Sequence, residues 1–319
     1  MGEWFALLAA LSFASSNVMV KKGTTPQSRE NGAFLSILLT AVISGIFFLG
    51  AGWFNGFPDF TSEGMLWFAL AGVLTSFIGR ILLFNSIQHL GSVRASAIKR
   101  LNPFFTVMIG ILFLQETLTS FIILGMVLIF GSTVVLVGES LANWRNAKKE
   151  IAAAIEPSSP PQRRLVAKDL WKLIASLGYV YGIVSALAYS VGYVVRKQGL
   201  TEIPDPFFGT LLGAIVGMLI FGLISLFKEA NRRSIISTFT EFKPWLFGAG
   251  VATSLGQIFY FIALQYSGVS QVALIASTDV ILTIFLSAWV FKTQEGITRT
   301  VILASLVAMT GAGFIALGS

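Results

Sequence analysis

The sequence of 319 residues contains no cysteine, a single histidine (His89) and few charged residues, which make up 12% of the chain. The lack of cysteine excludes disulfides, thiolate chemistry and cysteine metal sites, and one histidine cannot build a multi-histidine metal centre. We therefore expect no metal and no other cofactor. The sequence also lacks a phosphate-binding loop and a serine-hydrolase elbow, so we expect neither ATP hydrolysis nor enzyme activity.

What the chain has instead is apolar sequence: 55% of its residues are hydrophobic and its mean hydropathy is +0.80. An ordinary soluble domain carries about 25% charged residues. The apolar residues come in uncharged blocks of about 20, the length of helix that spans a bilayer. The first block begins at Trp4 without a basic segment before it, so we expect a retained helix and not a cleaved signal. The sequence thus predicts an integral membrane protein, which we expect in a prokaryotic plasma membrane.

The uncharged runs predict ten transmembrane helices in an all-α fold. They lie near residues 3–21, 32–54, 64–88, 93–114, 118–138, 173–195, 206–227, 244–266, 269–291 and 297–318. The uncharged stretch from Pro244 to Thr278 is too long for one span, and we divide it at the turn-like cluster Ser267-Gly268-Val269-Ser270.

Residues 139–172 form a polar linker that contains Pro157, Pro160 and Pro161. Its first part, from Ser140 to Ile155, has two interpretations that the sequence leaves open. It is either a short helix lying on the membrane surface or a solvated connector. The linker divides the chain into a first unit of residues 1–138 and a second unit of residues 173–319.

The two units resemble each other in sequence. Setting Gly2 against Gly178 pairs Ala10-Leu11 with Ala186-Leu187, Val18 with Val194, Lys21 with Lys197 and Gly23 with Gly199. Setting Trp67 against Trp245 pairs Ala71-Gly72-Val73 with Ala249-Gly250-Val251, and Thr75-Ser76 with Thr253-Ser254. With one gap, Gly91 falls on Gly268, Ile98 on Ile275 and Asn102 on Asp279. A five-helix unit is therefore repeated. Because five is odd, the second copy is inverted in the membrane, an arrangement that suits alternating access.

These residues carry a resemblance to a known family. With the run after Gly91, Asn102-Pro103-Phe104-Phe105 and Leu112-Phe113-Leu114-Gln115-Glu116, the chain resembles the EamA-domain members of the drug/metabolite transporter (DMT) superfamily. The second half keeps Gln294-Glu295 at the matching junction but has Val280 where the first half has Pro103. The resemblance implies ten helices and the transport of small metabolites, among them amino acids, sugars and organic ions.

Four charged residues lie well inside predicted spans and away from their ends: Arg80, Lys99, Arg100 and Asp279. A charge at mid-bilayer costs about 2.5–3.5 kcal/mol on insertion scales, so each one should face a wet cavity or a partner. We predict that they bind substrate. The alternatives are a structural ion pair, for example Asp279 with Lys99 or Arg100, and side chains that reach the membrane interface. Neighbouring Lys99 and Arg100 favour an anion, whereas an unpaired Asp279 would favour a cation or couple a proton.

Polar stripes add further candidates. Tyr189 and Tyr193 share a helix face with Tyr181 and Ser185, and Asn17 is the repeat counterpart of Tyr193. Gln257 lies on one side of the eighth predicted helix with Ser254 and Gln265, as do Ser76, Arg80 and Gln88 on the third. A pocket wall, an interfacial tyrosine belt and hydrogen bonding between helices all account for these stripes. We also predict that Gly209, Gly213 and Gly217 form a ridge for close helix packing.

The leading functional hypothesis is a secondary transporter that moves a small metabolite, anionic or amino-acid-like, by alternating access. The bilayer, the substrate and a coupling proton or counter-substrate are its expected partners, and nucleic acid is not. A passive channel, a lipid flippase and a membrane enzyme acting on lipid are the alternatives. We expect a central cavity bordered by the first, third, fourth, sixth, eighth and ninth helices, with the fifth and tenth peripheral.

Orientation gives the first testable prediction. The loops after odd-numbered helices carry 17 of the 22 lysines and arginines, while the opposite side carries Arg196 and Lys197. The positive-inside rule then places the linker in the cytoplasm and both chain ends outside. In intact cells, an impermeant thiol reagent should label a cysteine introduced at Ser319 but not one at Ser159. The reverse pattern would overturn this orientation.

Overall fold

The computed structural model describes residues 1–28, 30–99, 101–102, 104–105, 108–109, 119–155, 178–276, 278–292 and 298–318. All secondary-structure elements within these ranges are helices. In the first half they are α1 (Gly2–Gly23), α2 (Ala33–Asn55), α3 (Ser62–Ala71), the π-helical segment η1 (Gly72–Gly79), α4 (Arg80–Leu90), α5 (Ser92–Ile98) and α7 (Ser120–Ile155). In the second half they are α9 (Tyr179–Glu202), α10 (Pro206–Ser225), α11 (Glu229–Thr240), α12 (Pro244–Tyr266), α13 (Val269–Ala276), α14 (Asp279–Phe285), the π-helical η2 (Leu286–Val290) and α15 (Arg299–Gly318).

Five helices in the described part of the chain are long and apolar enough to cross a membrane. They are 2–23, 33–54, 62–90 (α3, η1 and α4 in continuous succession), 206–225 and 244–266. Each lies within two residues of a predicted span at both ends. The predicted division after α12 is also confirmed, because Ser267 and Gly268 separate α12 from α13.

Other predicted spans differ from the structure. The span 173–195 was placed too early: helix α9 follows Gly178, whose φ of 84° suits glycine, and it continues to Glu202. The span 269–291 is interrupted between α13 and α14. The helix predicted to end at residue 138 is longer, because α7 runs on without a break through the first part of the linker to Ile155. Arg100, Pro103, Leu112–Glu116, Gln294-Glu295 and residues 156–172 lie outside the described residues.

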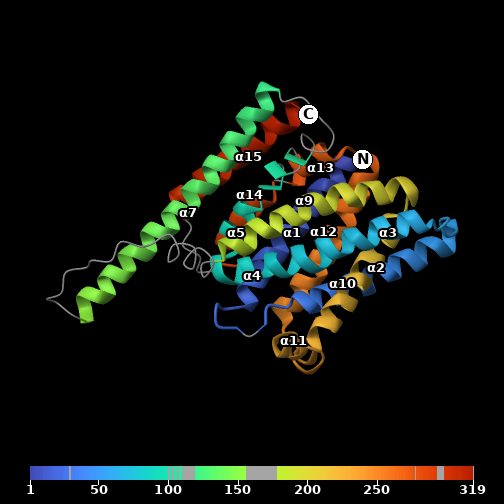
Figure 1. Ribbon diagram of the computed structural model, residues 1–319, viewed down its shortest axis with the longest axis horizontal. Helices are drawn as coiled ribbons and strands as arrows, with labels where there is room; N and C mark the ends of the chain where they lie inside the picture. The colour runs from blue at the N-terminus through green and yellow to red at the C-terminus, as the bar shows by residue number, and fades with distance from the viewer. Residues whose placement is uncertain are drawn as a thin grey trace.

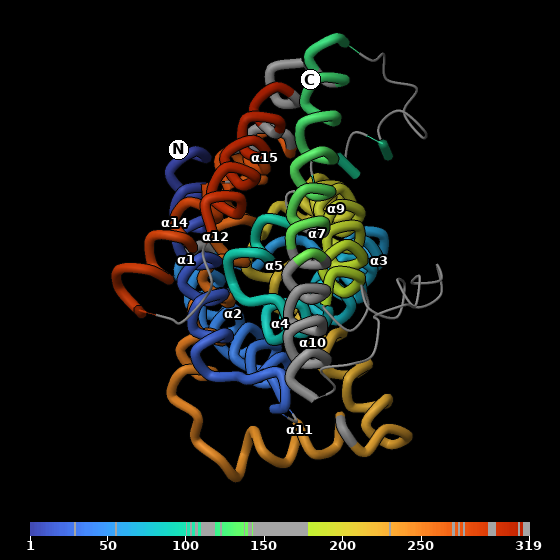
Figure 2. Tube along the Cα trace, turned by 90° about the vertical axis from the view of Figure 1, so that its left-hand side faces the viewer, coloured from blue at the N-terminus to red at the C-terminus, as the bar shows by residue number. Residues whose placement is uncertain are grey.

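The helices pack in pairs that join the two halves of the chain. Extensive pairs include α1 with α12, α7 with α15, α2 with α10, and α9 with the helix made of α3, η1 and α4. Figure 1 shows α7 and α15 side by side along one edge of the bundle. Both views place the start of α1 and the end of α15 towards the same end of the molecule, with α11 at the opposite end (Figures 1 and 2).

Small residues let the central helices approach closely. A methyl group added at Gly72 would lie 2.5 Å from the Cα of Gly213, so η1 and α10 are in backbone contact. Gly209 packs against the ring of Phe68, and Gly217 against the side chain of Ser76. The predicted glycine ridge is confirmed. Its partner is the third predicted span, the helix that carries Arg80.

The ridge leads to a prediction about stability. Gly72→Ala forces the backbones of η1 and α10 apart and should lower stability by about 1–3 kcal/mol, the usual effect of overpacking. Gly222→Ala in α10 is the matched control, because no atom lies within 4 Å of its added methyl group. Thermal unfolding of the detergent-purified variants measures the difference. Equal melting temperatures for the two variants would show that the close approach is not required.

Candidate functional site

Three of the four predicted intramembrane charges are described, and all three are buried. Arg80 is 0% exposed, Asp279 2% and Lys99 9%, while Arg100 lies outside the described residues. The structure adds a fourth charge, Arg196, which is 2% exposed. The described buried charges are thus three cations and one carboxylate, and the site has an excess of positive charge.

Arg80 begins α4 directly after the π-helical segment η1. Its Nη1 donates to the backbone oxygen of Ser36 at 3.0 Å and to the Thr40 hydroxyl at 2.7 Å, both on α2. The Thr40 hydroxyl is in turn 3.0 Å from that of Ser254 on α12. One end of the guanidinium is therefore held by groups from neighbouring helices.

The other edge of the Arg80 guanidinium is different. Its Nε and Nη2 are buried and have no hydrogen-bond partner. The Tyr189 side chain comes close enough to this guanidinium for a weak polar interaction, but its hydroxyl does not form a hydrogen bond of good geometry with Nε or Nη2. A buried donor without an acceptor costs about 1–3 kcal/mol, and more when it is charged. Arg80 is thus anchored at one edge and unsatisfied at the other.

Arg196 lies within α9, and its assignment to a loop in the sequence analysis was wrong. Nη1 donates to Gln257 Oε1 at 2.7 Å and Nη2 to Thr75 Oγ1 at 2.8 Å. The guanidinium carbon lies 3.8 Å from the centre of the Phe261 ring, a cation–π distance. These partners allow a charged residue to remain inside the bundle. A sequence signal was present, because Arg196 continues the face of Tyr189 and Tyr193 three residues further along the helix.

Tyrosine rings connect the two arginines. Tyr189 and Tyr193 are buried, and their ring centres lie 5.5 Å apart. Tyr193 stacks on Tyr260 of α12 at 4.3 Å, a residue that the sequence analysis did not select. The rings are enclosed by helices and do not form an interfacial belt. We call Arg80, Tyr189, Tyr193, Arg196 and Tyr260 the arginine–tyrosine cluster.

Lys99 and Asp279 form the ion pair that the sequence analysis weighed as an alternative. Lys99 Nζ lies 3.8 Å from Asp279 Oδ2, and it also lies 4.4 Å from the centre of the Phe13 ring and 5.5 Å from that of Tyr189. The Tyr189 ring is therefore shared between the ion pair and the arginine–tyrosine cluster. The two groups form one continuous network.

The remaining predicted residues link helices around this network. Asn17 Nδ2 donates to Ser96 Oγ at 2.9 Å, so it joins α1 to α5. Gln257 is the acceptor for Arg196. Gln88 and Gln265 lie away from the cluster and donate to loop carbonyls, Gln88 to Thr25 and Ser28 and Gln265 to Pro204. These last two residues tie helix ends to loops and do not bond one helix to another.

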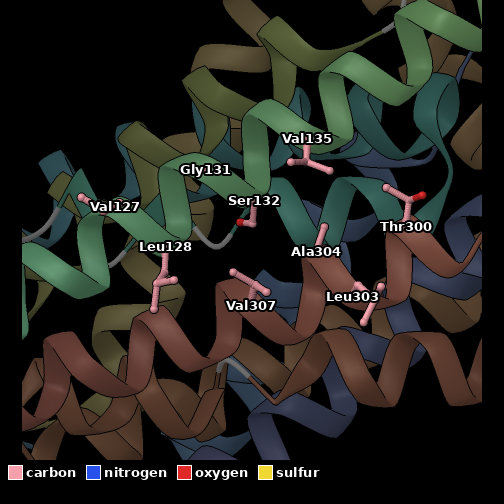
Figure 3. Close-up of a pocket in the computed structure, with 9 residues that line it drawn as sticks. All are labelled: Val127, Leu128, Gly131, Ser132, Val135, Thr300, Leu303, Ala304 and Val307. Carbon is pink, nitrogen blue, oxygen red and sulfur yellow. The ribbon is translucent and has the colours of Figure 1, made fainter.

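A cavity of about 400 Å³ lies elsewhere, between α7 and α15 (Figure 3). It is lined by Val127, Leu128, Gly131, Ser132, Val135, Thr300, Leu303, Ala304 and Val307. This lining is almost entirely apolar and includes none of the charged residues of the network. The cavity belongs to the two helices that the sequence analysis placed at the periphery, and we do not assign the chemistry to it.

The contacts of Arg196 lead to a prediction that a double-mutant cycle tests. Gln257→Leu leaves Nη1 of Arg196 buried without an acceptor and should lower stability by about 1–3 kcal/mol. Arg196→Leu alone leaves the side-chain oxygens of Gln257 and Thr75 without their hydrogen-bond donor. The double variant should cost less than the sum of the single variants, because the two residues are direct partners. Gln198→Leu, an exposed change on the same helix, is the control. Additive effects in thermal unfolding would mean that the pair is not coupled.

Comparisons with known proteins agree with this architecture. The sequence matches the EamA-like transporter family over residues 1–138 and 176–317. One solved crystal structure superposes with a TM-score of 0.56 at 15% sequence identity, covering 99% of this chain and 96% of the other, which shows a shared fold. No curated protein sequence matches the chain. The apolar helices and the family match together establish an integral, multi-pass membrane protein: the chain belongs to the EamA-like transporter family, within the DMT superfamily.

Proposed function

We propose that the protein is a secondary transporter that moves a small, anionic or amino-acid-like metabolite by alternating access, using ten spans arranged as two inverted five-helix repeats. The family match supports transport in general terms. The substrate and the mechanism rest on the packing and on the buried charges. The observation that carries the proposal is the correspondence between helix contacts in the two halves.

Exchanging the two halves of the chain maps the principal helix pairs onto one another. The pair α1 with α12 becomes α9 with the helix made of α3, η1 and α4, and both pairs are observed. The pairs α2 with α10 and α7 with α15 map onto themselves. A two-fold relation between the halves predicts this set of contacts, and an odd-numbered unit makes that relation an inversion.

Individual residue contacts follow the same correspondence. Three contacts of the segment around α2 with α12 are Gly32 with Leu246, Ser36 with Gly250, and Thr40 with Ser254. The corresponding contacts of α10 with α3 and η1 are Gly209 with Phe68, Gly213 with Gly72, and Gly217 with Ser76. Near the helix ends, Gly2 packs on Ser267 as Gly178 packs on His89. The alignment of Trp67 with Trp245 pairs four of these eight positions, and the alignment of Gly2 with Gly178 pairs one more. The three positions on α2 and α10 correspond with a shift of one residue. Two such similar packings favour two conformations of similar free energy, open to opposite sides of the membrane.

The charges break this symmetry. Arg80 is aligned with Ile258, and Arg196 with Val20, so the two arginines belong to one of the two equivalent helix pairs. Their anchors differ as well, because the first half has Ser36 and Thr40 where the second half has Gly213 and Gly217. A shared scaffold thus carries a cationic site on one side, which favours an acidic group on the substrate.

We also propose that residues 139–172 link the two repeats and lie in the cytoplasm. Because Arg196 is buried inside the bundle, Lys197, nearer the end of α9, is the one remaining cation of the two counted on the opposite side of the membrane. The bias towards the linker side is therefore stronger than the sequence analysis counted.

Counterflow in proteoliposomes tests the transport mechanism. Acidic metabolites and amino acids that raise the melting temperature in a thermal-shift screen provide the labelled solutes, because a ligand of the folded state stabilises it. We expect unlabelled solute inside the vesicles to drive accumulation of labelled solute, which a carrier does. Equilibration without accumulation would indicate a passive channel, and transfer of lipid between leaflets would indicate a flippase.

The ion pair of Lys99 with Asp279 gives a prediction about transport. Lys99→Ala should weaken transport of an acidic solute at least about tenfold, equivalent to about 1.4 kcal/mol, while folded yield changes less. Because Lys99→Ala leaves Asp279 buried without its cation, the double variant with Asp279→Asn restores a neutral site and should keep the transport defect. Lys228→Ala, an exposed lysine, is the control. Full transport by the double variant would make the pair purely structural.

A further inference from the structure

The unsatisfied edge of Arg80 has a defined shape. In a guanidinium group, Nε and Nη2 project their N–H bonds in parallel from the same edge, and Nη1 lies at the far corner. In Arg80 it is Nη1 that contacts Ser36 and Thr40, whereas Nε and Nη2 are the atoms without partners. The anchored corner holds the plane of the group in place. What remains is a two-pronged donor that matches the two oxygens of a carboxylate.

We propose that the Nε and Nη2 edge of Arg80 binds a carboxylate group of the transported molecule, an assignment that rests on the transport function proposed above. Within the described residues, the one buried carboxylate, Asp279, is engaged with Lys99. The acceptor for the Arg80 edge is supplied by the ligand. The bidentate pair forms when the ligand enters and is lost when it leaves.

Arg196 does not play the same part. Both of its Nη atoms are occupied, by Gln257 and Thr75, and its plane lies over Phe261. It offers Nε alone, which cannot form a bidentate pair. Arg196 interacts electrostatically with the same tyrosines as Arg80 and with Arg80 itself, so it raises the positive potential at the site. It is a positioning residue, and Arg80 is the residue that contacts the ligand.

The surroundings of Arg80 indicate what the rest of the ligand is like. Tyr189 faces the guanidinium and is the first of three neighbouring rings that continue through Tyr193 to Tyr260. Flat aromatic rings pack well against a planar organic group. The ligand class is therefore an organic carboxylic acid with a planar or aromatic body, in preference to a small inorganic anion.

Entry to the site requires helix α9 to separate from the segment that carries Arg80. Ser185 Oγ donates to the backbone oxygen of Gly79 at 2.7 Å, and a methyl group added at Gly79 would lie 3.0 Å from the Tyr189 ring. The structure is closed here, and Arg80 has no exposure. Separation of this pair of helices is the movement that alternating access demands of one half against the other.

The test compares benzoate with its neutral isostere benzamide, with acetate and with phenyl phosphate. Purified wild-type protein should be stabilised against heat by benzoate, less by acetate, and not by benzamide. Arg80→Lys keeps the charge but loses the two-pronged edge, and it should weaken benzoate binding at least about tenfold. Arg196→Lys should lower the melting temperature without ligand, yet keep the preference for benzoate over benzamide.

A second variant covers the case in which Arg80→Lys does not fold. Thr40→Val has nearly the same shape and removes the hydroxyl that holds Nη1, so the guanidinium can turn and benzoate affinity should fall several-fold. Thr210→Val, which removes a buried hydroxyl bonded within α10, is its control and should bind benzoate like the wild type.

Several outcomes would overturn the assignment: no stabilisation of the wild type by either carboxylate, equal effects of benzoate and benzamide, a preference for phenyl phosphate, or unchanged benzoate affinity in both Arg80→Lys and Thr40→Val.

Counterflow separates this inference from the transport function. Counterflow of a neutral solute without carboxylate binding would keep the transporter and reject the Arg80 site. Carboxylate binding that depends on Arg80, without counterflow of any bound acid, would keep the site and reject transport.

Discussion

The organisation of the bundle centre depends on the cost of removing a guanidinium from water. Arg80 and Arg196 are both buried, and a buried charge is tolerated only where other groups replace the hydration that it loses. The acceptors come from separate helices: Ser36 and Thr40 from α2, Thr75 from η1 and Gln257 from α12. Three segments must therefore converge on two side chains. The contact of Arg196 with Thr75 also joins the two halves of the chain, because α9 packs against η1.

Glycine makes that convergence possible. Gly72 and Gly213 bring η1 and α10 into backbone contact, and a methyl group added at Gly192 would lie 2.4 Å from Thr75 Cγ2, which brings α9 against the same segment. Close approach places the Thr75 hydroxyl within reach of Arg196. In a bilayer, where apolar helices gain little by leaving lipid, small residues and interhelical hydrogen bonds provide much of the attraction between helices. The packing and the polar network consequently stabilise each other.

The site adds asymmetry to a scaffold that is nearly the same in both halves. Corresponding contacts recur in both halves, but Ser36 and Thr40 carry hydroxyls where α10 has Gly213 and Gly217. In the alignment of the halves, Arg80 corresponds to Ile258 and Arg196 to Val20. In the function proposed above, the repeated contacts suit a change between two conformations, and the added polar groups contact the substrate. A ligand that satisfies the Arg80 edge would then favour the conformation that binds it, and differential binding of this kind shifts a conformational equilibrium. The Lys99–Asp279 pair touches the same network through the Tyr189 ring.

The sequence by itself determined where the five long apolar helices of the described residues lie. The ends of α12 follow from Lys243 before it and the Ser267-Gly268 turn after it, and the buried positions of Arg80, Lys99 and Asp279 follow from their place inside long apolar runs. A membrane span is recognised by the hydropathy of neighbouring residues, so the local sequence is enough to predict its position. Only the tertiary structure decided that α9 continues past Arg196, that a break separates α13 from α14, and that Arg80 is anchored at Nη1 with its other edge unsatisfied. Hydropathy treats a charged residue as the end of a span. Whether a charge can remain inside depends instead on hydrogen-bond acceptors such as Gln257 and Thr40. Gln257 lies 61 residues from Arg196 in the sequence and Thr40 lies 40 residues from Arg80, so only the folded chain brings each acceptor to its arginine.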